Sequence, residues 1–153
     1  MRSNELNLDS YNTDKITHGY LDVYDPVLAP WVDKEIKLLQ IGVREGGSLQ
    51  LWRDYFRLGV IIGIDIKLPE HFVPGERIQI FEGSQSDKQF LSEVANKTAP
   101  EGFDIIIDDA SHISVRVPVT NFDSTTRTTL SFSTKLSLPD QRDAGGGGRT
   151  ARG

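Results

Sequence analysis

Four short apolar runs recur along the first two thirds of the chain, and each ends at a glycine or an acidic residue. Runs of this length and character are typical of strands buried on both faces of a parallel sheet. Between them, apolar residues spaced three and four apart predict helices over residues 47–58 and 88–96. This alternation predicts an α/β fold with about four parallel strands, over residues 36–41, 60–65, 77–82 and 103–108.

A further helix is predicted before the first strand. Gly19 weakens this helix, and Pro26 should end or kink it. The helix is either a packing element laid across the sheet or, through Asp14, Thr17 and His18, part of a ligand lid. Its predicted apolar face consists of Ile16, Tyr20, Leu21, Tyr24, Val27 and Leu28.

The composition limits the class of protein. With 153 residues, of which 37% are hydrophobic, the chain has room for one domain with a modest core. It has no cysteine, which excludes disulfides and cysteine-ligated metals, and no run of about 18 apolar residues that could span a membrane. The net charge of −5 disfavours nucleic acid as the main partner. The first residues lack the apolar core of a signal peptide, so we expect a cytoplasmic location.

The sequence changes character near residue 114. Residues 1–113 contain 19 acidic residues and 11 lysines and arginines, whereas residues 114–153 contain 3 and 6. The second segment is rich in serine, threonine and glycine, and we predict a disordered tail. We therefore expect a flexible N-terminus at 1–13, a domain at 14–113 and this tail. A change of reading frame near residue 114 is one hypothesis for the break, and the nucleotide sequence tests it.

Candidate chemistry begins at the end of the first predicted strand. There, Gly42 is followed by Gly46, Gly47 and Ser48 at the start of a predicted helix. Glycines let a ligand approach the backbone, and a helix N-terminus presents free N–H groups. Asp65 ends the second predicted strand 23 positions after Gly42, near the spacing at which an acid binds ribose hydroxyls. The pattern indicates a nucleotide-binding crevice.

Two further groups of polar residues follow predicted strands. Ser86 and Asp87 follow the third, where they either cap the next helix or flank an adenine ring. Asp108 ends the fourth, and Asp109 and His112 follow it. Paired carboxylates favour a divalent cation, and a histidine can take up a proton near neutral pH. The alternative for this second group is a capped turn with solvated acids.

Residues 11–113 resemble class I S-adenosylmethionine-dependent methyltransferases with a Rossmann-like fold. Within that class they are similar to the metal-dependent sugar O-methyltransferases of macrolide antibiotic biosynthesis and the related cephalosporin hydroxylase-like proteins. The resemblance implies methyl transfer to a hydroxyl of a sugar or polyketide-type small molecule. The motifs that carry it are DKITHGY at 14–20, LLQIGVREGGSLQLW at 38–52, IIGIDI at 61–66, GSQSD at 83–87 and FDIIIDDASHI at 103–113.

The resemblance also implies a role for individual residues. Asp109 would bind Mg²⁺, and His112 would be the general base that deprotonates the acceptor hydroxyl. The remaining positions would contact S-adenosylmethionine: Gly42, Gly46, Gly47 and Ser48 at its methionine and ribose end, Asp65 at the ribose hydroxyls, and Ser86 and Asp87 at the adenine.

The chain departs from the family pattern in two places. Gln40 stands where the family usually has an acid, which should weaken one cofactor contact. The Glu-Asp pair that completes the family's metal site is not found after His112. We therefore expect weak cofactor binding, little turnover, and an open edge on the fourth strand that favours self-association. The alternatives are a non-catalytic fragment or partner-binding module, and a nicotinamide-dependent oxidoreductase, which Arg44 in the glycine loop disfavours.

Overall fold

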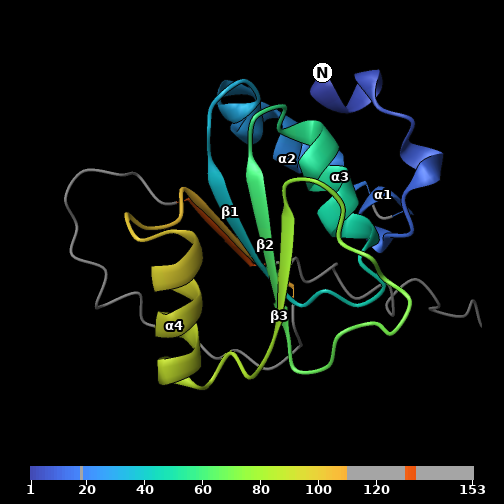
Figure 1. Ribbon diagram of the computed structural model, residues 1–153. Coiled ribbons are helices and arrows are strands. Elements are labelled where there is room, and N and C mark those ends of the chain that lie inside the picture. Colours follow the sequence, from blue (N-terminus) through green and yellow to red (C-terminus); the bar gives the residue numbers. More distant parts are fainter. Residues whose placement is uncertain (18, 110–129, 134–153) are drawn as a thin grey trace, which may run out of the picture.

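A parallel sheet with strand order β3-β2-β1-β4-β5 forms the centre of the structure (Figure 1). The structure is a computed structural model, which describes residues 1–17, 19–109 and 130–133. The apolar runs form the strands because each can be buried on both faces of the sheet. The strands are β1 Lys37–Ile41, β2 Val60–Asp65, β3 Ile78–Glu82, β4 Ile105–Asp108 and β5 Leu130–Ser133.

The four predicted strands are confirmed, and each ends at the residue that the sequence predicted. β1 lies between β2 and β4, with Leu39 in register with Ile62 on one side and Ile106 on the other. The chain therefore passes from β1 to β2 on one side, while β4, on the other side, comes from much later in the sequence. A ligand crevice is expected at the carboxyl ends of strands where the order reverses in this way.

β5 corrects one expectation about the edge of the sheet. The sequence predicted an open edge on the fourth strand and no regular structure in the tail. Instead, Leu130–Ser133 pairs in parallel with β4, with Ile105 in register with Leu130. The other predicted features of the tail lie outside the described residues. Self-association through a sheet edge stays a prediction.

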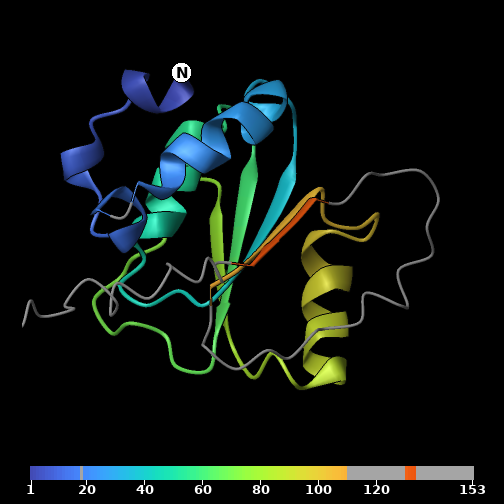
Figure 2. The ribbon, with the colours of Figure 1, turned by 180° about the vertical axis from the view of Figure 1, so that it is seen from behind.

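The helices cover both faces of the sheet (Figures 1 and 2). Because side chains alternate along a strand, Leu38 and Ile61 face one layer and Leu39 and Ile62 face the other. The first layer contains α2 and α3, and the second contains α4. The bounds are α1 Asp14–Thr17, α2 Tyr20–Leu28, α3 Gly47–Tyr55 and α4 Lys88–Thr98, with 3₁₀ turns at Arg2–Glu5, Leu8–Ser10 and Ala29–Trp31. Among the described residues, none of these helices is long and apolar enough to span a bilayer.

α3 is the most deeply buried helix beside the site. Trp52, Tyr55 and Phe56 are fully buried, and the rings of Trp52 and Tyr55 meet edge to face with centroids 5.9 Å apart. The predicted helix end at residue 58 is wrong, because Phe56 turns into extended conformation at φ −95° and ψ 103°. The Arg77 guanidinium then donates to the carbonyls of Arg53, Phe56 and Gly59 at 2.8–3.0 Å. Arg77 therefore adds side-chain donors to carbonyls at the end of the helix and just beyond it.

The helix predicted before β1 is divided into two. Gly19 adopts the left-handed conformation, with φ 67°, and separates α1 from α2. Pro26 does not end α2, which continues to Leu28. Val27 is 41% exposed, so its prediction as part of the buried face is wrong. The burial of Leu21, Tyr24 and Leu28 turns Val27 outward.

The N-terminus, which the sequence predicted to be flexible, forms two 3₁₀ turns that are held against α2 and α3. The Arg2 guanidinium donates to the carbonyls of Asp54 at 2.6 Å and Tyr55 at 3.1 Å. The Ser3 backbone N–H and hydroxyl both donate to the buried carboxylate of Asp25. These contacts direct the chain toward the carboxyl ends of the strands.

Candidate functional site

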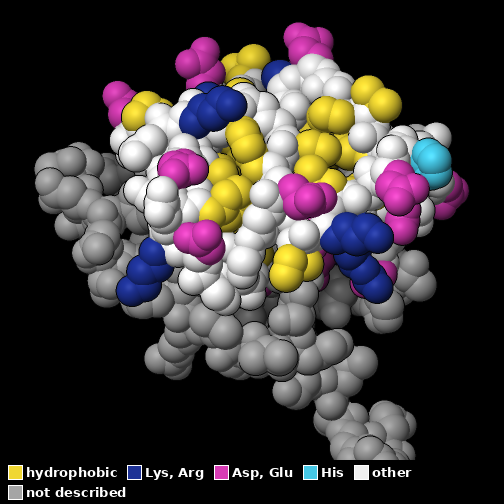
Figure 3. All heavy atoms as spheres, turned by 60° about the horizontal axis from the view of Figure 1, so that its bottom comes forward, with side chains coloured by type: hydrophobic (Ala, Val, Ile, Leu, Met, Phe, Trp, Pro, Cys, Tyr) yellow, Lys and Arg dark blue, Asp and Glu magenta, His cyan; other side chains and the backbone are white. Residues whose placement is uncertain are grey.

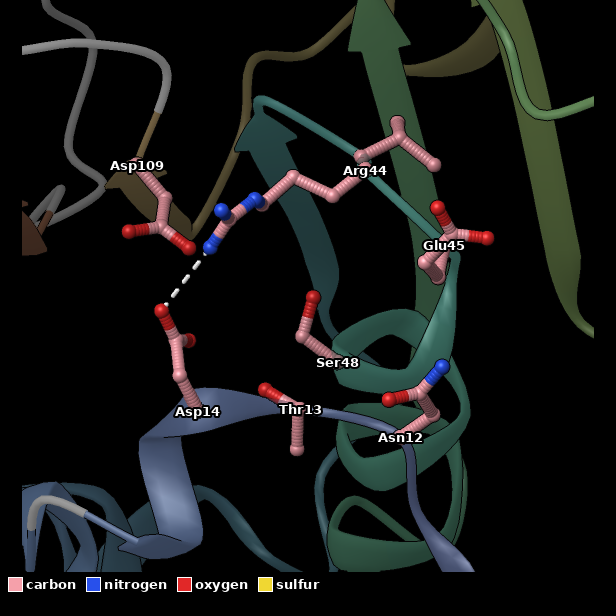
Figure 4. A pocket seen from close by; sticks show the side chains of 8 residues that line it. Asn12, Thr13, Asp14, Arg44, Glu45, Ser48 and Asp109 are labelled. Atoms are coloured by element: carbon pink, nitrogen blue, oxygen red, sulfur yellow. Dashed lines mark hydrogen bonds and ion pairs between the residues drawn. The ribbon is translucent and has the colours of Figure 1, made fainter.

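A pocket of about 290 Å³ lies at the carboxyl ends of β1 and β4 (Figure 4). Three segments supply its walls: the N-terminal segment before and at α1, the loop from β1 into α3, and the first residue after β4. Most of the side chains around it are polar. The lining residues are Asn12, Thr13, Asp14, Val43, Arg44, Glu45, Ser48 and Asp109. The crevice predicted at the glycine loop is therefore present.

Asp65 holds the loop that follows β1. One oxygen of its carboxylate accepts hydrogen bonds from the backbone N–H groups of Val43 at 2.8 Å and Arg44 at 3.2 Å. Gly42, with φ 92°, makes the turn that begins the loop, and its N–H donates to the carbonyl of Ile64. The structure thus brings Asp65 and Gly42 together as the sequence predicted. Asp65 therefore also has a structural role, because it holds the loop after β1 in place.

Gly46 and Gly47 allow other parts of the protein to approach the loop closely. A Cβ atom at Gly46 would lie 2.3 Å from the ring of Phe72, and one at Gly47 would lie 2.0 Å from the backbone oxygen of Asn12. Both distances are too short for any side chain. These glycines place the N-terminal segment and the loop after β2 against the start of α3. Their contact with a cofactor stays a prediction.

Gln40 connects β1 to the pocket through a buried set of hydrogen bonds. Its Nε2 donates to the carbonyl of Gly42 at 2.7 Å and to the hydroxyl of Ser48 at 2.6 Å. Its Oε1 accepts from the indole Nε1 of Trp52 at 2.9 Å. Gln40 is fully buried and Ser48 is 6% exposed. The sequence identified position 40 only as a departure from a family pattern.

Two ion pairs tie α1 to the other walls. The ammonium of Lys15, whose side chain is 1% exposed, pairs with the carboxylate of Asp109, which is 19% exposed. Arg44 extends across the pocket to Asp14, with 2.9 Å between nitrogen and oxygen (Figure 4). The lid suggested for the residues around Asp14 is consistent with this position. Lys15 and Arg44 were not predicted as site residues, because no local pattern links them to acids that lie far along the chain.

The described residues do not by themselves assemble a complete magnesium site. Their histidine, aspartate and glutamate side chains form no group of three or more that could hold a metal ion. The carboxylate that the resemblance assigns to Mg²⁺, Asp109, already pairs with the buried Lys15. A divalent cation needs several oxygen ligands. Asp109 as a metal ligand stays a prediction.

The loop after β3 contains the residues predicted to cap a helix or to flank an adenine. Asp87 caps α4, accepting from the N–H groups of Gln89 at 3.0 Å and Phe90 at 3.1 Å, so capping is confirmed for Asp87, while an adenine contact by Ser86 and Asp87 stays a prediction. The N–H of Ser86 donates to the hydroxyl of Ser84. The Oε1 atom of Gln85 is buried and has no hydrogen-bond partner among the described residues. His112, the predicted base, lies outside the described residues.

The chain is similar in sequence to known O-methyltransferases. No family model matches the chain. It is 36% identical over 104 residues to the 8-demethyl-8-(2-methoxy-alpha-L-rhamnosyl)-tetracenomycin-C 3'-O-methyltransferase of Streptomyces olivaceus, a match that covers 63% of this chain and 26% of the relative. It is 36% identical over 107 residues to the mycinamicin VI 2''-O-methyltransferase of Micromonospora griseorubida, covering 65% and 26%. The chain thus spans about a quarter of the length of these relatives.

Solved structures agree with these relatives. The structure resembles the MycE methyltransferase of the mycinamycin biosynthetic pathway, solved in complex with Mg, SAH and mycinamycin VI, with a TM-score of 0.56 and 34% identity over 70% of this chain and 28% of that one. A ribosomal RNA methyltransferase of Plasmodium falciparum, 19% identical with a TM-score of 0.52 over 69% and 59% of the two chains, shares the fold alone. The chain has the class I methyltransferase fold, and its matched segment is related to the sugar O-methyltransferases of macrolide and tetracenomycin biosynthesis.

Proposed function

We propose that this chain binds S-adenosylmethionine in the pocket between β1, β4 and α1, and serves methyl transfer to a hydroxyl of a small-molecule sugar. One observation carries the proposal. The polar pocket lies at the carboxyl ends of the central strands, within a segment that is 36% identical to sugar O-methyltransferases. MycE, with a similar fold, was solved with SAH bound.

The groups around Asp65 suit the nucleoside part of such a ligand. The N–H groups of Val43 and Arg44 donate to one carboxylate oxygen and the N–H of Lys67 donates to the other at 3.4 Å; a carboxylate can accept about four hydrogen bonds, so capacity remains for a ribose hydroxyl. Ile66, the next residue, is 75% exposed and offers apolar surface to a base. Ser86 and Asp87 complete the proposed adenine contacts.

The charges around the pocket suit the other end of the ligand. Asp14, Glu45 and Asp109 supply carboxylates, and Arg44 supplies a guanidinium. S-adenosylmethionine carries a sulfonium, an ammonium and a carboxylate, so both signs of charge are required. On the face shown in the space-filling view, acidic and basic side chains are interspersed with apolar ones (Figure 3). A mixed surface of this kind is consistent with a small-molecule acceptor rather than nucleic acid.

The role of the described residues in methyl transfer is to position the cofactor. When bound, S-adenosylmethionine supplies a methyl group on an electrophilic sulfonium, and transfer needs an acceptor oxygen in line with it. The loop held by Asp65 and the wall formed by Asp109 would fix the ligand on two sides. Removal of the acceptor proton is assigned, by resemblance alone, to His112. No step is derived through Mg²⁺, because the described residues do not assemble its ligands.

Calorimetric titration of the purified chain with S-adenosylmethionine, with and without Mg²⁺, tests the proposal. Asp65→Asn keeps an acceptor for the loop N–H groups but removes one for ribose, so we expect saturable binding that this variant weakens by about tenfold. Asp33→Asn changes a side chain that is 70% exposed and does not line the pocket, so this variant should bind as the wild type does. A folded chain that shows no saturable binding contradicts the proposed function.

A further inference from the structure

Asp109 connects the pocket to a buried cation. Its carboxylate lines the pocket at the end of β4 (Figure 4) and pairs with the ammonium of Lys15, which does not line the pocket. We propose that Lys15 competes with divalent cations for this carboxylate, and thereby lowers the affinity of Asp109 for a metal ion. The inference goes beyond the proposed function, because this competition needs neither the cofactor nor the acceptor.

The sheet holds the backbone of Asp109 in place. Its N–H donates to the carbonyl of Ile41 at 2.8 Å, which continues the pairing of β4 with β1 by one residue. The carboxylate is 19% exposed, so a cation that enters the pocket can reach it. Because the backbone is held by the strands, the groups already in contact with the carboxylate determine how strongly it attracts that cation.

Lys15 is held firmly beside this carboxylate. Its side chain is 1% exposed and is among the largest fully buried side chains of the described chain. The backbone N–H of Lys15 donates to the hydroxyl of Thr13 at 3.3 Å, and the next residue, Ile16, packs against the hydrophobic core. These contacts keep α1, and with it the ammonium, at the end of the sheet. Solvent and salt screen a charge in such a position less than one on the surface.

A cation at the carboxylate weakens its attraction for a second one. Lys15 balances the single negative charge of Asp109, and its ammonium repels a divalent cation that approaches the same group. Mg²⁺ and related cations bind through several oxygen ligands, so further acids would be needed to restore the attraction. Within the described part of the chain, no group of three or more acids and histidines could supply them. Metal binding at Asp109 is therefore opposed by Lys15.

The second ion pair of the pocket does not have this effect. Arg44 and Asp14 are 73% and 46% exposed, and an ion pair with this exposure contributes little and is screened by salt. A cation that binds Asp14 can displace the Arg44 guanidinium into water. The ammonium of Lys15 has no such route, because its side chain is buried. The competition is therefore specific to Lys15 and does not follow from the total charge of the pocket.

Calorimetric titration of the full chain with manganese chloride, in the absence of S-adenosylmethionine, tests the competition. We expect Lys15→Met and Lys15→Gln to bind Mn²⁺ about tenfold more tightly than the wild type, within the usual range for coupled sites. The gain should disappear in the double variant Lys15→Met with Asp109→Asn, which lacks the carboxylate. Lys97→Met removes the same charge from an exposed position on α4, so it should bind Mn²⁺ as the wild type does.

Lys15→Gln offers Asp109 a neutral N–H donor in place of the ammonium, so it keeps the inference testable if Lys15→Met does not fold. Thermal melting reports whether each variant is folded, and Mn²⁺ should raise the melting temperature of Lys15→Gln more than that of the wild type. Folded Lys15 variants that bind Mn²⁺ no more tightly than the wild type overturn the inference. A gain in affinity that persists in the double variant also overturns it, because the metal would then bind elsewhere.

Discussion

The ammonium of Lys15 pairs with the carboxylate of Asp109, 94 residues further along the chain. Lys15 belongs to α1 and Asp109 follows β4, so this pair binds the N-terminal segment to the end of the sheet. The Lys15 side chain is 1% exposed and pairs inside the protein with a carboxylate that is 19% exposed. The pair closes the pocket on the side away from the Asp65 loop.

We expect Lys15→Met to destabilise the fold by about 3 kcal/mol, the lower end of the range for broken buried pairs, because Asp109 keeps 19% of its side chain exposed. Urea unfolding measures the loss. The double variant Lys15→Met with Asp109→Asn leaves no carboxylate without its cation, so it should lose less than Lys15→Met alone. A double variant that is less stable than the single variant would contradict the view that the pair acts as a unit.

Asp25 predicts a loss of stability in acid. Burial alone would raise the pKa of its carboxyl, but hydrogen bonds from Ser3 and Tyr55 outweigh burial and hold the pKa below the ordinary value of 3.8. A pKa that is lowered by folding contributes stability above the ordinary value, and this contribution is lost as the pH falls through the folded pKa. Asp25→Asn should cost about 2 kcal/mol at pH 7 and less at pH 3.

Urea midpoints at the two pH values check this expectation. Asp33→Asn serves as the control, because the Asp33 side chain is 70% exposed and its surface ion pair with Arg57 contributes little. An Asp25→Asn loss that is equal at pH 7 and pH 3 would show that the carboxylate charge is not what stabilises this cluster.

Arg77 offers a matched pair of substitutions. Its guanidinium donates to three carbonyls, and its backbone has a φ of 62°, which is unfavourable for any residue except glycine. Arg77→Ala should cost about 3 kcal/mol, because it leaves these carbonyls without the guanidinium and keeps the backbone strain. Arg77→Gly loses the same hydrogen bonds but relieves the strain, so it should be more stable than Arg77→Ala by about 1 kcal/mol. Thermal unfolding compares the two, and an alanine variant as stable as the glycine variant would argue against strain.

Gly47 predicts a coupling between the N-terminal segment and the pocket. The Cβ of Gly47→Ala would lie 2.0 Å from the backbone oxygen of Asn12, so residues near 12 must move away from α3. We expect faster hydrogen exchange in residues 1–15 and weaker binding of S-adenosylmethionine. Gly75→Ala, whose Cβ would meet only the flexible end of the Arg53 side chain at 3.2 Å, is the control. Unchanged exchange in Gly47→Ala would mean that the segment is not held by this contact.

The sheet could be predicted from the sequence because its signals are local. The run Val60–Asp65 lies between Gly59 and a polar loop, and its predicted bounds are the observed ones. The end of α3 could not be predicted, because the burial of Phe56 against other elements overrides the helical spacing. The prediction that Val27 is buried was wrong for the same reason, because helical spacing alone does not show which of two neighbouring side chains faces the core.

The site was predictable only where its residues belong to one motif. Gly42, Ser48 and Asp65 were found because strand, turn and helix follow one another in sequence. The pairing of Lys15 with Asp109 depends on how α1 lies over the sheet, so it cannot be predicted from the spacing of residues along the sequence. The amide oxygen of Gln40 accepts a hydrogen bond from Trp52, and this partner could not be predicted because it depends on how α3 packs on β1.

The central position of β1 also sets the order in which the pocket can be completed as the chain is made. The bond between Val43 and Asp65 closes a loop of 22 residues, whereas the pair between Lys15 and Asp109 closes one of 94. The longer closure costs about 1.3 kcal/mol more in chain entropy. The ribosome must also release β4 before that pair can form. The cofactor loop can therefore be in place while one wall is still missing, and a ligand that touches both would stabilise the contact that forms last.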